Sequence, residues 1–242
     1  MEQSHQPAPR KFNSSLFIPI AIVIAGALIA AAIVFKPSPN QSETGSESAN
    51  SDQVRKSVIA IGTKIGLNKN ALTKCIDNPD ETKALIEADM ASGEKIGIQG
   101  TPFLIFEFPQ KNGSMKTMAV PGAIPREAIQ QIIKDQKLPE GFPNTPVGEY
   151  PPVTSDDHLT NELAGAKAHI IEYSDLDCPY CHKLHPELEA VTSADTSVVW
   201  AYRQFPLVNL HPNAYQKALA SECVAKLGGS EKFFSFIHEI MK

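Results

Sequence analysis

Two cysteines separated by two residues are the part of this sequence best suited to chemistry. Cys178 and Cys181 enclose a Pro-Tyr pair, and this spacing brings both sulfurs to one end of a helix, where a disulfide can form and reopen. A helix N-terminus carries roughly half a positive charge and stabilises a thiolate. We therefore expect an exposed Cys178 to act as the nucleophile and the deeper Cys181 as the resolving thiol.

The same spacing also occurs in zinc sites, which need two further ligands. The remaining cysteines, Cys75 and Cys223, are isolated in the sequence, while His182 and His185 could complete a mixed cluster with the pair. A proline inside the motif and an apolar run before it favour redox chemistry instead. We predict no metal and no other cofactor.

The elements on either side of the motif must hold it in place. Ile170, Ile171 and Tyr173 predict a buried strand. A helix then begins around Pro179, where the missing N–H costs nothing. Glu172 lies within the strand and is expected to point inward, where burial disfavours its charge. The alternative is that strand alternation turns Glu172 to solvent.

The rest of the pattern predicts a mixed α/β domain with a helical insertion. Asn68, Asp80, Asn213 and Ser230 are the expected N-caps of four helices. The expected helices cover 54–65, 69–76, 80–93, 126–137 and 213–227, with a last one from 230, and the other expected strands cover 103–108, 114–120 and 198–204.

Length and charge limit the functions to consider. The chain has 242 residues, is 42% hydrophobic and 20% charged, and carries a formal net charge of -5. A mildly acidic balance gives no electrostatic reason to expect a nucleic-acid partner. Without the first ~50 residues, enough chain remains for one domain with a full core.

The N-terminal region predicts a membrane anchor. Residues 16–35 carry no charge and suffice, at ~1.5 Å per residue, to cross a ~30 Å hydrocarbon core. Arg10 and Lys11 precede them, so residues 1–15 are expected in the cytoplasm and the domain on the other side of the cell membrane. The alternative is a signal peptide cleaved near residues 30–32. Both place the cysteine pair in an oxidising compartment.

Two segments are expected to lack regular structure. Residues 36–52 are polar and predict a disordered tether. Residues 138–157 contain five prolines and predict a linker between the parts at 53–137 and 158–242.

Several stretches together resemble the DsbA-like thiol oxidoreductases of the thioredoxin superfamily. They are Ile171-Glu-Tyr-Ser-Asp-Leu-Asp-Cys-Pro-Tyr-Cys181, Tyr202-Arg-Gln-Phe-Pro-Leu with Leu210-His-Pro-Asn213, and Gly97-Ile-Gln-Gly-Thr-Pro102. The resemblance implies a thioredoxin-like fold. It also implies that Thr101 and Pro102, a cis-proline loop, present backbone to a substrate chain beside Cys178.

The same resemblance implies roles for the residues around the cysteines. Glu172 would lie beneath the disulfide and help to move protons. Pro179 and Tyr180, the dipeptide between the cysteines, would tune the redox potential and contact substrate. Cys75 and Cys223, both on expected helices, could form a structural disulfide in an oxidising compartment, or remain two buried thiols.

The order of the parts departs from the family. There the redox motif precedes the Gly-Thr-Pro loop, whereas here residues 53–137 resemble the later part of the domain and 158–242 the earlier part. A circular permutation is the simplest interpretation, because new termini are tolerated at exposed sites. Halves exchanged between two chains, a truncated tandem and a gene-model artefact are alternatives.

The sequence thus predicts a membrane-anchored extracytoplasmic thiol–disulfide oxidoreductase that introduces disulfides into exported proteins. From the family alone, a membrane quinone-linked partner would reoxidise it. One alternative is a reductase or isomerase with the same site. Another is a redox-inactive module that binds peptides or assists assembly.

Overall fold

The computed structural model describes residues 42–242. The fold below is that of the compact unit Ser48–Lys242. The anchor predicted at 16–35 lies outside the described residues. From residue 42 onward, none of the helices combines the length and apolar character needed to cross a bilayer.

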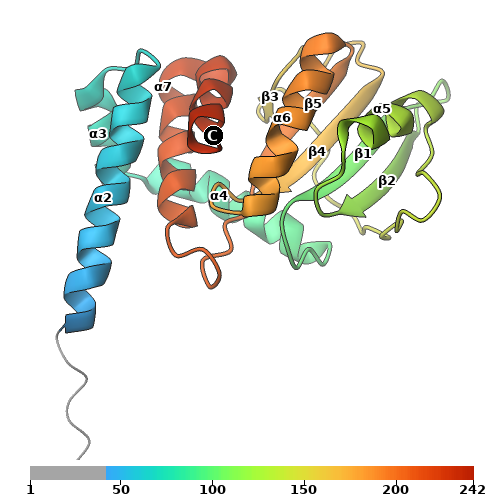
Figure 1. Ribbon diagram of the computed structural model, residues 1–242. Helices are drawn as coiled ribbons and strands as arrows, with labels where there is room; N and C mark the ends of the chain where they lie inside the picture. The colour runs from blue at the N-terminus through green and yellow to red at the C-terminus, as the bar shows by residue number, and fades with distance from the viewer. Residues whose placement is uncertain (1–41) are drawn as a thin grey trace, which may run out of the picture. The chain divides into compact units, whose positions relative to one another are not determined.

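A mixed five-stranded sheet in the order β2-β1-β4-β5-β3 forms the centre of the domain (Figure 1). β1 pairs antiparallel with β2 and β4, whereas β4 and β5 run parallel and α6 connects them. The runs of apolar and aromatic residues in β1, β4 and β5 suit a pleated surface that is buried on both faces. The strands are β1 (Phe103–Pro109), β2 (Met115–Pro121), β3 (His158–Leu159), β4 (Ala168–Ser174) and β5 (Val198–Gln204).

The pairing of β1 with β4 joins the two parts of the chain. It places Leu104 opposite Glu172 and Phe103 opposite Tyr173, so the strand after the Gly-Thr-Pro loop lies directly beside the strand before the cysteines. Residues 53–137 and 158–242 therefore complete one sheet within a single chain. Whether this order arose by permutation stays a prediction.

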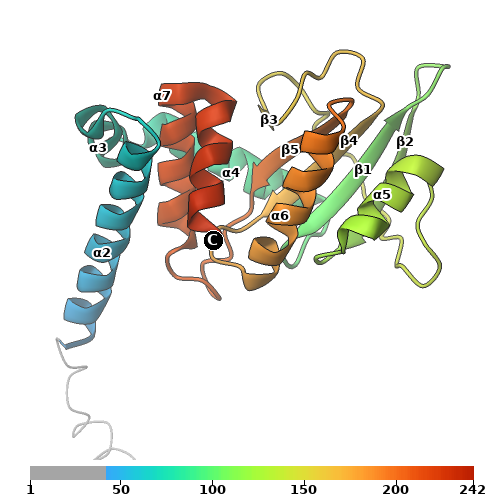
Figure 2. The same ribbon diagram turned by 45° about the horizontal axis from the view of Figure 1, so that its top comes forward.

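Helices cover one face of this sheet. α5 (Arg126–Asp135) and α6 (Pro179–Ala194) lie over it, and the C-terminal part of α7 (Ala214–Ile240) packs beside them (Figures 1 and 2). Trp200 of β5 contacts Phe234 of α7, with ring centroids 5.0 Å apart. Burial of these large aromatic side chains is a main source of the domain's stability.

The opposite face is covered by the end of α4 (Asp80–Lys95) and by the proline-rich connection. Residues 138–157 contain no helix or strand, as predicted. They are nevertheless packed, because Val147, Tyr150 and Val153 contact this face and the Tyr150 hydroxyl donates to Glu107 (2.9 Å). The connection is therefore part of the core.

A disulfide ties the remaining helices together. Cys75 on α3 (Lys69–Asp77) is bonded to Cys223 on α7, across a sequence separation of 148 residues. Asn68 caps α3 by accepting from the backbone N–H of Ala71 (3.0 Å), as its sequence position predicts.

The tether predicted at 36–52 is wrong from Ser42 on, because α2 extends from Ser42 to Lys64. Adding residues to an existing helix costs far less than starting one. Two hydrogen bonds also connect α2 to the start of α7. Asn50 donates to Asn213 (3.1 Å), and Ser51 accepts from Gln216 (2.6 Å).

Two helix caps and one strand also differ from the sequence-based expectation. Pro79 is the N-cap of α4, so Asp80 lies in the first turn, where its charge interacts with the helix dipole. Asn213 is the N-cap residue of α7, but its side chain accepts from Asn50 rather than from its own helix. The expected break before Ser230 falls at Gly229 (φ 73°), and the short strand β3 was not predicted.

Candidate active site

The cysteine pair lies at the N-terminus of α6, as the spacing predicts. Cys178 is the N-cap residue, Pro179 opens the first turn and Cys181 follows within it. The fold brings this end of the helix to the Gly-Thr-Pro loop, 77 residues earlier in the chain. The Cys178 thiol donates to the Thr101 carbonyl oxygen (3.3 Å), and the peptide bond between Thr101 and Pro102 is cis.

Both sulfurs are free thiols and both are buried. Cys178 is only 4% exposed, so the expectation of an exposed nucleophile is wrong. The loop before β1 covers the Cys178 sulfur through Thr101, 77 residues earlier in the chain. The spacing of the two cysteines carries no information about such a distant contact. The exposed residues at this end of α6 are Pro179 and Tyr180, and the Tyr180 side chain is 60% exposed.

The surroundings favour a thiolate at the first cysteine. The pKa of Cys178 is lowered to about 5, chiefly by a hydrogen bond from the Cys181 thiol, although burial acts in the opposite direction. The Thr101 hydroxyl, which has no partner among the described residues while Cys178 is a thiol, lowers the pKa further, as do the backbone N–H groups of Cys181 and Tyr180. Burial, followed by the bond to Cys178, raises the pKa of Cys181.

Titration of the reduced protein should therefore show thiolate absorbance from Cys178 with a midpoint at pH about 5. Thr101→Val removes one donor with little change in shape and should move this midpoint upward. Thr196→Val, at an exposed position, is the matched control and should leave it unchanged. A midpoint near pH 8.5 in the unchanged protein would show that these donors do not stabilise the thiolate.

Glu172 lies on β4 and is buried, rather than turned to solvent as strand alternation alone allowed. Ser174 donates to its Oε1 (2.7 Å), while Oε2 has no hydrogen-bond partner among the described residues. Burial raises the pKa of Glu172 to about 7. Its charge also raises the pKa of Cys181, so the carboxyl is electrostatically linked to the deeper thiol.

This raised pKa has a measurable effect on stability. The ionised form is disfavoured in the folded state, so the free energy of unfolding should fall as pH rises from about 4.5 to about 7. Glu172→Gln removes this loss. The variant should match the unchanged protein near pH 4 and exceed it by about 3 kcal/mol above pH 7, at about 1.4 kcal/mol per pKa unit.

Urea unfolding at several pH values measures this difference, and Glu127→Gln, at an exposed position on α5, is the control. Parallel pH profiles for Glu172→Gln and the unchanged protein would mean that the buried carboxyl is not destabilised.

The turn before α6 is fixed by a buried carboxylate. Asp175 accepts from the backbone N–H of Leu207 (2.7 Å) and pairs with His211 Nδ1 (2.8 Å), so it holds the loop after β5 against the motif. Asp177 forms an ion pair with Lys217 of α7. These contacts assign positioning roles to residues that the motif alone left without one.

The histidines considered as metal ligands beside the cysteines do not form that cluster. His182 donates from Nε2 to the Leu176 carbonyl (2.9 Å). His185 packs against Trp200, with ring centroids 5.2 Å apart, and lies near His238 of α7. A separate group of His185, Glu189 and His238 was not predicted. The only sequence signal for it was the four-residue spacing of the first two.

The comparison with known families agrees with this geometry. Residues 163–242 match the thioredoxin family model. The matched region contains β4, α6, β5 and α7, and therefore the cysteine pair. The chain thus contains a thioredoxin-like domain within a mixed α/β fold, and this domain is compatible with thiol–disulfide oxidoreductase activity.

Curated proteins also match part of the chain. A Na(+)/H(+) antiporter NhaA 3 of Salinispora tropica is 36% identical over 78 residues, which are 32% of this chain and 12% of the relative. A Na(+)/H(+) antiporter NhaA 1 of Mycolicibacterium vanbaalenii is 33% identical over 91 residues, 37% of this chain and 14% of the relative. The match thus spans about an eighth of these relatives' length. No solved structure matches the chain significantly.

Proposed function

We propose that the chain is a thiol–disulfide oxidoreductase of DsbA-like type that introduces disulfides into exported proteins. The observation that carries this is the contact between the Cys178 thiol and the Thr101 carbonyl (3.3 Å) beside Pro102. It places a reactive sulfur next to backbone groups that could pair with an extended client chain. Tyr180 and the exposed Leu210 would add apolar contacts to that client.

The oxidised enzyme would carry a Cys178–Cys181 disulfide. A client thiolate attacks Cys178 sulfur, the bond to Cys181 breaks, and Cys181 leaves as a thiolate. Glu172, whose pKa burial raises to about 7, would supply the proton. A second client thiolate then attacks the client sulfur of the mixed disulfide. Cys178 leaves as a thiolate, so the client gains a disulfide and the enzyme is reduced.

The acidity of Cys178 supports the proposed direction of reaction. A thiol that remains ionised at neutral pH stabilises the reduced enzyme and leaves a mixed disulfide readily, and both effects favour oxidation of the client. Reoxidation would require a partner, and a membrane quinone-linked protein is our proposal on family grounds.

We also propose an extracytoplasmic location, with residues 16–35 as the anchor. The disulfide between Cys75 and Cys223 supports it, because structural disulfides persist in oxidising compartments. The order of the Gly-Thr-Pro loop and the cysteines supports a permuted DsbA-like domain.

The redox potential tests the direction. The full chain in detergent is equilibrated with graded glutathione buffers, and the oxidation state of Cys178 and Cys181 is read by mass after alkylation. An oxidase should give a potential near about -120 mV. A value near about -270 mV would instead indicate a reductase with the same site.

A further inference from the structure

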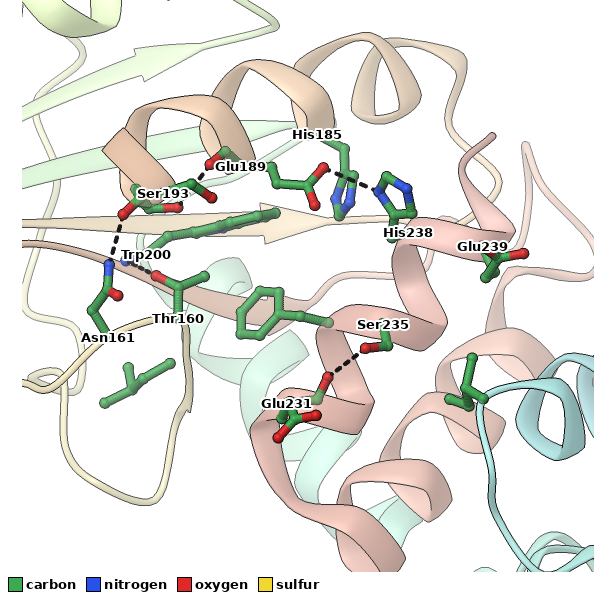
Figure 3. Close-up of a pocket in the computed structure, with 14 residues that line it drawn as sticks. Thr160, Asn161, His185, Glu189, Ser193, Trp200, Glu231, Ser235, His238 and Glu239 are labelled. Atoms are coloured by element: carbon green, nitrogen blue, oxygen red, sulfur yellow. Dashed lines mark hydrogen bonds and ion pairs between the residues drawn. The ribbon is translucent and has the colours of Figure 1, made fainter. Parts of the chain in front are cut away.

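Three potential metal ligands meet between α6 and α7, away from the cysteine pair. His185 and Glu189 are four residues apart on α6 and so share one face of that helix. His238 comes from α7 and points toward them (Figure 3). The donor atoms of the three side chains all lie within 4.8 Å of one another.

Packing alone does not explain why a polar side chain, His185, is buried at this position. It is only 4% exposed, yet its Nδ1 has no hydrogen-bond partner among the described residues. A buried polar atom without a partner costs free energy.

We propose that His185, Glu189 and His238 bind a divalent transition-metal ion, for which Zn²⁺ is the best match. Two imidazoles and one carboxylate are a ligand set that zinc takes in proteins. Glu189 Oε2 already lies 3.0 Å from His238 Nδ1, and both side chains are partly exposed.

The surrounding space fits the same proposal. The cluster borders a cavity of about 500 Å³ that is also lined by Phe234 and by Trp200 (Figure 3). Three protein ligands leave a fourth position, which water from this cavity would fill. Because the ligands come from two helices, a bound ion would cross-link α6 to α7 and stabilise the folded state. This site does not depend on the proposed redox function.

Co²⁺ is a suitable probe, because its visible absorption reports the coordination geometry. The full chain carrying Cys178→Ser and Cys181→Ser is titrated with Co²⁺, so that no free thiol competes for the ion. We expect one Co²⁺ per chain, displacement by Zn²⁺, and a thermal midpoint that rises with Zn²⁺ concentration.

Two partly exposed ligands allow variants that should still fold. In the same background, His238→Ala and Glu189→Gln should each weaken Co²⁺ binding by at least about tenfold, as loss of a ligand-shell group commonly does. Glu187→Gln, on α6 but outside the cluster, is the matched control and should bind as before. Binding that is unaffected by both ligand variants, or no binding to the parent protein, would overturn the proposal and leave only an ion pair between Glu189 and His238.

Discussion

Replacing Cys178 with alanine should lower the rate of client oxidation by at least about a thousandfold, to near the uncatalysed rate, because the Cys178–Cys181 disulfide that a client thiolate attacks can no longer form. The disulfide that remains joins Cys75 to Cys223, and Cys223 is fully buried, so this bond is poorly placed to accept the attack instead. Oxidation of a dithiol peptide, followed by mass, measures the rate.

The second cysteine gives a complementary result. In Cys181→Ala the Cys178 thiolate can still attack oxidised glutathione and release one glutathione thiolate, but no Cys181 thiol is present to resolve the product, so a mixed disulfide with glutathione should accumulate and be visible as an added mass. Ser114→Ala, in the exposed hairpin turn, controls for substitution itself and should react as before. Oxidation that persists in Cys178→Ala would refute the assignment of Cys178 as the sulfur that the client thiolate attacks.

If the unchanged protein itself shows only background exchange and still binds unfolded peptides, a redox-inactive binding module becomes the better interpretation. The cysteine variants would then have no effect on peptide binding.

Removing the disulfide between Cys75 and Cys223 should have the largest effect on stability. The bond links residues 148 positions apart and restricts the unfolded chain strongly. In the chain-entropy account, a loop of this size contributes on the order of 5 kcal/mol. Native disulfides typically contribute about 2–5 kcal/mol, so we expect the Cys75→Ala, Cys223→Ala protein to lose an amount in that range.

Urea unfolding measures the loss. The comparison is made in the Cys178→Ser, Cys181→Ser background, so that no other cysteine can exchange. Dithiothreitol should lower the unfolding midpoint of the parent to that of the double alanine protein and leave the latter unchanged. If dithiothreitol has no effect on the parent, the disulfide is not stabilising, or it does not form.

The sequence predicts most strands because their signal is local. β5 was predicted at its observed bounds, since Val198, Val199, Trp200 and Tyr202 form an unbroken run of strand formers. β3 consists of two residues, and two residues carry no periodicity. It forms because β5 offers an edge, which is a tertiary cause.

The candidate site could be predicted only in part, because some of its features depend on contacts between distant parts of the chain. The Cys-Pro-Tyr-Cys spacing and the Gly-Thr-Pro loop identified residues that the fold does bring together, Cys178 with Thr101. The burial of Cys178 depends on that contact, so the spacing alone gave the wrong exposure. The cluster at His185 and His238 needs the packing of α7 on α6, which no local pattern specifies.

The order of the four cysteines along the chain affects how the correct disulfide forms during folding. In chain order the two members of the structural bond are the first and the last cysteine, and the two reactive thiols come between them. A chain synthesised from its N-terminus and oxidised while it emerges therefore offers Cys75 two wrong partners before Cys223 appears. Four cysteines allow three pairings, so early oxidation favours mispaired intermediates that thiol–disulfide exchange must correct. Maturation would then go most smoothly if oxidation waits until α7 has been made.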